Sequence, residues 1–314
     1  MRMPADDCST GALRLSESCF IGVRGLRYHL RCWGPAAADS DLTIVMLHGW
    51  MDVSASFQFV VDALAPDWRV VAPDWRGYGL TARAQADCYW FPDYLADLDC
   101  ILDEVQGRRV VLAGHSMGGN VALLYAGIRP NRVDAVINLE GFGLRQTHAE
   151  QAPQRYAQWL DEVRAGGSLR DYASLADVER RLLRNNARLE PARARFLAPH
   201  WSQQQADGRW AVAGDPAHRI VNPTLYRLEE VLACWQRITC PVLWVRADST
   251  DVLRFVAEEP RAALHEVERR RDAIADVESI VIEDAGHMVH HDQPERLAAA
   301  ITDFISRRLL ASDR

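Results

Sequence analysis

Short apolar runs alternate with amphipathic stretches along most of the chain. The apolar runs are rich in Val, Ile and Leu, which is typical of strands buried on both faces of a sheet. They lie at residues 42–50, 69–79, 108–114, 133–143, 240–248 and 279–287. Stretches with helical periodicity lie between or after them, at residues 54–66, 93–107, 117–130, 258–275 and 293–310. This order of strands and helices predicts an α/β fold with a mostly parallel sheet covered by helices on both faces.

The alternation is preceded by a hairpin pattern and is interrupted once. Two short runs separated by Arg24-Gly25 predict an antiparallel hairpin near the start of the chain. After residue 143 helical periodicity dominates and no buried strand is predicted, so we expect a helical cap inserted into an α/β core. The predicted division is a flexible N-terminus at 1–12, a core at 13–142 and 236–314, and a cap at 143–235.

Composition and charge narrow the class of partner. Apolar residues make up 48% of the 314 residues and charged residues 25%, as in ordinary globular proteins. All 36 basic residues are arginines, and with 43 acidic residues the net charge is −7. A net negative chain without a basic block argues against nucleic acid as the partner. The N-terminus lacks the apolar core of a secretory signal and no run is long enough to span a bilayer, so we expect a cytoplasmic protein without a membrane partner.

The cysteines and histidines do not predict a metal site. The seven cysteines are scattered and lack the Cys-x-x-Cys spacing of zinc sites. Their odd number and spread favour free thiols in a reducing compartment. We therefore expect no metal and no other cofactor. The sequence leaves the oligomeric state open between a monomer and a homodimer.

The segment Gly114-His115-Ser116-Met117-Gly118 joins a predicted buried strand to a predicted helix. A serine on such a sharp strand–helix turn is the nucleophile-elbow arrangement, in which small neighbours let the helix and the adjacent strand pass close to the turn. The hydroxyl then lies at the positive end of a helix, where free backbone N–H groups can hold an anion. This pattern predicts that Ser116 is a catalytic nucleophile.

A second segment, His48-Gly49-Trp50, follows the upstream buried strand. An oxyanion hole needs two donors, and the backbone N–H groups of Trp50 and Met117 are the candidates. The side chains of His48, His115 and Trp159 are candidates for the substrate pocket, although a buried core position fits His48 equally well.

The general base is expected from the segment "VIEDAGHMVHHDQPE" near the C-terminus. His287 follows a strand and an Ala-Gly turn, where it could reach Ser116 above the edge of the sheet. His290 and His291 compete for this role, but they lie beyond the turn. We interpret them as residues that support His287 or lie at the surface.

The ordered motifs HGW, DWRGYG, GHSMGG and DAGH resemble those of the α/β-hydrolase superfamily, in its serine-nucleophile branch. The resemblance covers about residues 20–310 and implies an eight-stranded, mostly parallel sheet with a helical cap after the sixth strand. Within the superfamily, the cap and the "NLEGFG" strand end resemble the serine hydrolase-like (kraken) proteins and relatives of the haloalkane dehalogenases.

The resemblance leaves the acid of the triad open among three carboxylates. The superfamily most often supplies it about nine residues after the proline that opens the strand at residue 241, and that position here is Thr250. Asp248 and Asp251 flank this position and are the alternatives. In the dehalogenase-related branch a glutamate at the preceding strand end supplies the acid, and Glu140 occupies that place. The expected triad is therefore Ser116, His287 and Glu140.

A serine nucleophile predicts acyl transfer, because the dehalogenases and epoxide hydrolases of this superfamily use aspartate at the elbow. We expect a hydrolase of carboxylic esters or thioesters that forms an acyl-enzyme on Ser116 and acts on a small-molecule substrate. Two alternatives remain, a non-hydrolytic or carbon–carbon-cleaving enzyme and a slow-turnover ligand-binding member.

The predicted cap holds the clues to the substrate. Residues 143–219 contain 12 arginines and 9 acidic residues, a net charge of +3 against −10 for the remainder. Such a cap suits an anionic leaving group, although a solvated helical face explains the small excess as well. Six aromatic residues of the cap could line an acyl pocket or pack between helices: Tyr156, Trp159, Tyr172, Phe196, Trp201 and Trp210.

Overall fold

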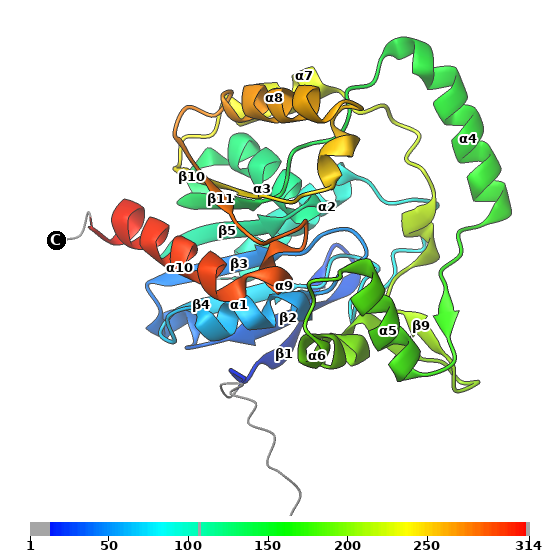
Figure 1. Cartoon of the computed structure of the whole chain (residues 1–314), viewed down its shortest axis with the longest axis horizontal. Helices are drawn as coiled ribbons and strands as arrows, with labels where there is room; N and C mark the ends of the chain where they lie inside the picture. Colours follow the sequence, from blue (N-terminus) through cyan, green and yellow to red (C-terminus); the bar gives the residue numbers. More distant parts are fainter. Residues whose placement is uncertain (1–12, 106–107, 312–314) are drawn as a thin grey trace, which may run out of the picture.

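The computed structural model describes residues 13–105 and 108–311, and its central element is an eight-stranded sheet (Figure 1). The strand order is β1-β2-β4-β3-β5-β6-β10-β11. The strands are β1 (Glu17–Val23), β2 (Leu26–Trp33), β3 (Leu42–Leu47), β4 (Arg69–Pro73), β5 (Arg109–His115), β6 (Ala135–Leu139), β10 (Val242–Ala247) and β11 (Val277–Ile282). The pairs β1–β2 and β2–β4 are antiparallel and the others are parallel. The predicted hairpin and the predicted eight-stranded, mostly parallel sheet are confirmed.

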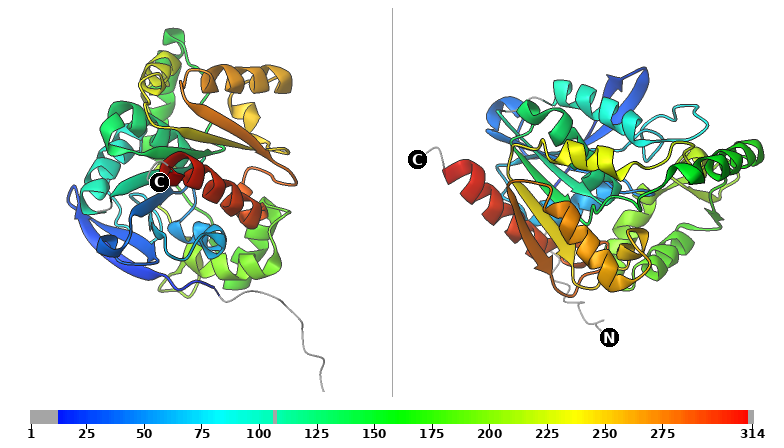
Figure 2. Two further views of the ribbon diagram at one scale, coloured as in Figure 1. Left: turned by 90° about the vertical axis from the view of Figure 1, so that its left-hand side faces the viewer. Right: turned by 90° about the horizontal axis from the view of Figure 1, so that it is seen from above.

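Helices cover both faces of the sheet (Figure 1 and Figure 2). One apolar cluster joins the sheet to α1 (Gln58–Ala63) and α10 (Pro294–Ile305), and these two helices contact each other. The cluster on the other face includes α2 (Phe91–Glu104), α3 (Met117–Ile128), α7 (Leu228–Trp235) and α8 (Pro260–Arg271). Every residue of β3 and β6 is buried, which explains their continuous apolar sequences.

The segment between β6 and α7, residues 143–227, is called the inserted segment below. It contains α4 (Ala152–Ala165), α5 (Leu175–Asn185), α6 (Pro191–Trp201) and a small sheet of β7 (Asp171–Tyr172), β8 (Ser202–Gln204) and β9 (Trp210–Val212). Helices α5 and α6 share an apolar cluster with Phe59 of α1, which attaches them to the core. Helix α4 buries no residue and stands away from the sheet in Figure 1. Helix α7, by contrast, packs against α3.

The expectations about membrane spans and cysteines are tested for the described residues alone. Within the described ranges, no helix combines the length and the apolar character that crossing a membrane requires. The six cysteines in those ranges are all free thiols. The flexible N-terminus predicted for residues 1–12 lies outside the described residues.

A buried ion pair anchors the loop after β4 to α2. Arg76 Nε and Nη2 each lie 2.5 Å from a carboxylate oxygen of Asp97, and Tyr28 donates its hydroxyl to the same carboxylate at 2.6 Å. The Asp97 side chain is fully buried. A buried charge that loses its partner cannot be rehydrated, so its free-energy cost is large.

We expect Asp97→Ala to lower the free energy of unfolding by about 3–5 kcal/mol, because it removes both short hydrogen bonds of buried Arg76 and leaves it only the Nη1 contact with Asp93. Urea denaturation measures this change. The matched control is Asp103→Ala. Asp103 lies on the same helix as Asp97 but is exposed and pairs with Arg132, so its loss should have little effect. Equal effects of the two substitutions would contradict the structural role of the buried pair.

Candidate active site

Ser116 lies on the turn between β5 and α3. Its backbone is in the left-handed region, with φ 53° and ψ −113°, and its N–H donates to the Leu139 carbonyl at 2.8 Å. A Cβ atom on Gly118 would lie 2.0 Å from the Leu47 carbonyl oxygen, and one on Gly114 would lie 2.3 Å from the Gly118 carbonyl oxygen. The tight turn therefore requires glycine at both positions, as the sequence pattern predicts.

Two backbone N–H groups next to Ser116 have no acceptor in the described chain. Met117 is the first residue of α3, where N–H groups have no intrahelical acceptor. The Trp50 N–H likewise donates no hydrogen bond to any described residue. A Cβ on Gly49 would lie 3.3 Å from the Ser116 Cβ, so the loop with Trp50 passes beside the serine. Both candidate oxyanion donors thus flank Ser116.

His48 stabilises this loop from inside the protein. It is fully buried, and its Nε2 accepts a hydrogen bond from the Trp75 backbone N–H at 2.9 Å. The Trp75 indole N–H donates back to the His48 carbonyl at 3.0 Å. His48 therefore stabilises the loop as a buried core residue, which is one of the two roles expected for it.

His287 and Glu140 are neighbours in space. His287 Nδ1 lies 3.2 Å from Glu140 Oε2. The other carboxylate oxygen accepts from the Ala247 N–H at 2.7 Å, and the Thr250 hydroxyl donates to Oε2. Thr250, at the position where the superfamily most often has the acid, thus contacts the carboxylate of Glu140. The hydroxyl of Ser116 makes no hydrogen bond with any described residue, and such contacts often tighten only when substrate binds.

Burial acts on both members of this pair. Burial raises the pKa of the Glu140 carboxyl to about 8, because desolvation outweighs the hydrogen bonds from Thr250 and Ala247. Burial lowers the pKa of the His287 imidazole below its ordinary value of 6.5. The Nδ1–H of a neutral His287 is a third donor to the Glu140 carboxyl, and the neutral ring can accept a proton at Nε2. Glu140 also has a left-handed backbone, with φ 61°.

The alternative acids form no ion pair with His287 in the described chain, although Asp251 lies close enough for its charge to raise the pKa of that ring against the effect of burial. Asp251 is an exposed residue that pairs with Arg254 at 2.6 Å. Asp248 accepts from the backbone N–H groups of Asp284 and Ala285, each at 3.2 Å, and so stabilises the turn before His287. Neither carboxylate has a hydrogen bond to His287 within the described residues.

Buried histidines surround His287 on its inner side. His115 Nε2 donates to the His287 carbonyl at 2.8 Å, and burial lowers the pKa of His115 to about 3. The ring of His290 lies 4.3 Å from that of His115, and both His290 and His291 are buried. The expectation that His290 and His291 could lie at the surface is therefore wrong, because the short helix α9 (Val289–Asp292) turns them inward.

These histidines include the one candidate metal group found in the described residues. Ligand atoms of Asp52, His290 and His291 all lie within 4.8 Å of one another and are buried. Asp52 Oδ2 and both ring nitrogens of His290 have no hydrogen-bond partner in the described chain. Sequence reasoning missed this cluster because Asp52 is distant in sequence from the two histidines. The expectation of no metal stays a prediction.

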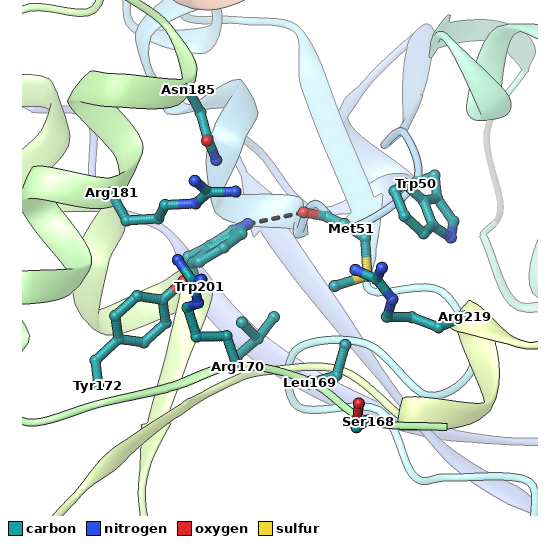
Figure 3. Close-up of a pocket in the computed structure, with 11 residues that line it drawn as sticks. Trp50, Met51, Ser168, Leu169, Arg170, Tyr172, Arg181, Asn185, Trp201 and Arg219 are labelled. Atoms are coloured by element: carbon teal, nitrogen blue, oxygen red, sulfur yellow. Dashed lines mark hydrogen bonds between the residues drawn. The ribbon is translucent and has the colours of Figure 1, made fainter. Parts of the chain in front are cut away.

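A pocket of about 570 Å³ opens between the inserted segment and the loop with Trp50 (Figure 3). Tyr172, Trp201 and Trp50 supply its aromatic walls. The Trp201 indole N–H donates to the Met51 carbonyl at 2.8 Å, which ties α6 to that loop. His48, His115 and Trp159, the predicted pocket residues, are not among the side chains that line it. Trp159 lies on α4, where its buried indole nitrogen faces the Cys88 thiol.

A comparison with protein families decides the affiliation of the chain. A family model described as alpha/beta hydrolase fold matches residues 43–294. The chain belongs to this family. The matched range of the α/β hydrolase includes the Ser116 turn, Glu140 and His287.

Similar proteins cover most of this α/β hydrolase. A serine hydrolase-like protein of Danio rerio is 26% identical over 287 residues, which are 87% of this chain and 83% of the relative. A 2-(acetamidomethylene)succinate hydrolase of Mesorhizobium japonicum is 26% identical over 262 residues, 83% of this chain and 87% of the relative. Among solved structures, a thioesterase domain from the curacin biosynthetic pathway has a TM-score of 0.80 at 22% identity, over 91% of this chain and 99% of that domain. The similarity to that domain concerns the fold.

Proposed function

We propose that this α/β hydrolase cleaves carboxylic esters or thioesters through an acyl-enzyme on Ser116. His287 is the general base and Glu140 is the acid that orients it. The backbone N–H groups of Trp50 and Met117 form the oxyanion hole. The observation that carries the proposal is the contact of His287 Nδ1 with Glu140 Oε2 at 3.2 Å, beside a serine in the left-handed elbow conformation. The serine hydrolase-like relative supports the same chemistry.

The mechanism has two acyl-transfer steps. The Ser116 oxygen attacks the carbonyl carbon while its proton passes to His287 Nε2, and the two N–H groups hold the oxyanion. Collapse of this intermediate breaks the bond to the leaving alcohol or thiol, which takes the proton from His287. Water then attacks the acyl-enzyme and gives its proton to His287. The bond to the Ser116 oxygen breaks, Ser116 takes the proton back from His287, and the carboxylic acid leaves. Glu140 keeps the proton of neutral His287 on Nδ1, so that Nε2 is free to accept.

Hydrolysis of 4-nitrophenyl esters of increasing acyl length is the direct test, together with acyl thioesters. Turnover that depends on Ser116 supports the proposal, and the best chain length measures the pocket. A wild-type protein that hydrolyses no ester or thioester contradicts it and favours a lyase or a ligand-binding protein of the same fold.

The pH dependence of the rate follows from the burial of His287. We expect kcat/KM to be retained as the pH falls through 6.5, with the midpoint of its acidic limb below that value, because burial lowers the pKa of His287 from 6.5. Activity is lost only where His287 becomes protonated and can no longer accept the proton of Ser116. Steady-state kinetics across the acidic range measure the midpoint, with circular dichroism at each pH as the control for folding. A midpoint above 6.5 would mean that the charge of Glu140 outweighs burial.

A further inference from the structure

The pocket beside Trp50 has a positively charged lining. Arg170, Arg181 and Arg219 line it, and none of its lining residues is acidic. Figure 3 shows Arg181 extending from α5 and Arg219 from the opposite wall. This lining contrasts with the net charge of −7 of the chain.

None of these three arginines has an ion pair or a hydrogen bond with any described residue. The neighbouring Arg180, on the same helix as Arg181, forms an ion pair with Asp177. Many other arginines in the described chain pair with acidic residues, as Arg132 does with Asp103 at 2.7 Å, although Arg184 of α5 has no such pair. Cations that converge on one cavity repel one another, and an anion between them removes that repulsion. A guanidinium group also offers paired donors that match a carboxylate or a phosphate.

The pocket adjoins the loop that carries one of the proposed oxyanion donors, and Ser116 and Met117 lie outside its lining. Trp50 forms part of its wall, and the backbone N–H of the same residue is one of the two proposed donors. Gly49, the preceding residue, lies against Ser116. A substrate whose carbonyl is held at Ser116 would have to extend past the Trp50 loop to reach the arginines. Leu169 and Val212 supply apolar surface within the pocket.

We infer that this pocket binds an anionic group, a carboxylate or a phosphate, carried by the ester or thioester substrate. The inference rests on the proposed function and names its substrate class. The carboxylate would lie at the far end of a dicarboxylic acyl chain, and the phosphate would lie in the leaving group of an acyl-coenzyme A. Arg170, Arg181 and Arg219 determine specificity and take no part in the chemical step.

Two matched substrate pairs test the inference and separate the two sources of charge. The mono-4-nitrophenyl ester of adipate is compared with 4-nitrophenyl hexanoate, and hexanoyl-coenzyme A with hexanoyl-N-acetylcysteamine. We expect the anionic member of one pair to have a kcat/KM about ten- to a hundredfold higher than its neutral partner, since a hydrogen bond to a charged group contributes that much. Preference in the first pair places the charge in the acyl part, and preference in the second places it in the leaving group.

Arginine variants assign the preference to the pocket. Arg181→Gln and Arg219→Gln should each lower the kcat/KM of the anionic substrate by about tenfold and leave that of the neutral partner unchanged. Arg184→Gln is the matched control, because it removes the same charge from the same helix α5 at a residue that does not line the pocket. The inference is overturned if neither anionic substrate is preferred, or if Arg184→Gln acts as strongly as Arg181→Gln.

A binding measurement separates this inference from the proposed function. Trp50 and Trp201 line the pocket, so tryptophan fluorescence of Ser116→Ala can follow titration with adipate and with pyrophosphate. Saturable binding that is lost in the double variant Ser116→Ala/Arg181→Gln supports an anion site even if no ester is hydrolysed, an outcome that would remove the proposed function alone. Ester hydrolysis without anion binding or anion preference would leave the proposed function intact and overturn the inference.

Discussion

Ser116→Ala is expected to reduce kcat for ester hydrolysis on the order of 10⁶-fold, because the acyl-enzyme cannot form without the hydroxyl. The fold should be unchanged, since the side chain of Ser116 makes no hydrogen bond with the described residues. Steady-state kinetics with a 4-nitrophenyl ester measure the loss. Mass spectrometry after treatment with a fluorophosphonate provides a second readout, because this reagent labels activated serines. We expect one adduct per wild-type chain and none on Ser116→Ala.

The matched control for the nucleophile is Ser249→Ala. Ser249 is an exposed serine near the turn that contains Asp248, and its loss should change neither the rate nor the labelling. Wild-type turnover or normal labelling in Ser116→Ala would reject the proposed mechanism. The wild type could be labelled at Ser116, and Ser116→Ala not labelled, while the wild type hydrolyses no ester. That result would indicate an activated serine that catalyses another reaction.

Glu140→Gln is expected to reduce kcat by about 10⁴-fold, the size of effect that follows when the acid of a serine triad becomes an amide. The amide cannot stabilise the imidazolium that forms when His287 takes the proton. The amide can also turn its NH2 group toward His287, and in that orientation it does not keep the imidazole proton on Nδ1. The volume of the side chain is conserved, so the Thr250 and Ala247 contacts on either side retain their space. Kinetics of the purified variant, with thermal unfolding as a folding control, measure the effect.

Asp251→Asn is the matched control for the acid. It makes the same chemical change at the exposed carboxylate that pairs with Arg254, and the rate should stay near that of the wild type. Asp248→Asn should affect stability of the turn before His287 more than the chemistry. If Asp251→Asn is inactive while Glu140→Gln is active, the acid has been assigned to the wrong residue and the enzyme class survives.

Periodicity predicted the sheet well because each central strand is buried on both faces. The sequences of β3, β5, β6 and β10 must be apolar at nearly every position, and this signal is visible without tertiary information. The sequence indicates a hairpin-like piece at residues 207–217 but not the full small sheet β7-β9-β8, because strands of two or three residues carry no periodic signal. The sequence left open whether His290 and His291 support His287 or lie at the surface, because a four-residue helix has no pattern to indicate its inward face.

The sequence by itself determined the fold and the local geometry at Ser116, because both depend on residues close together in the chain. Only the tertiary structure decided which carboxylate faces His287, since Glu140 lies 147 residues away in the sequence. Sheet order explains the contact: Glu140, Thr250 and His287 follow β6, β10 and β11, which are neighbouring parallel strands. The convergence of three unpaired arginines in one pocket likewise comes from α5, η5 (Pro216–Arg219) and the segment before β7, which only the folded chain brings together.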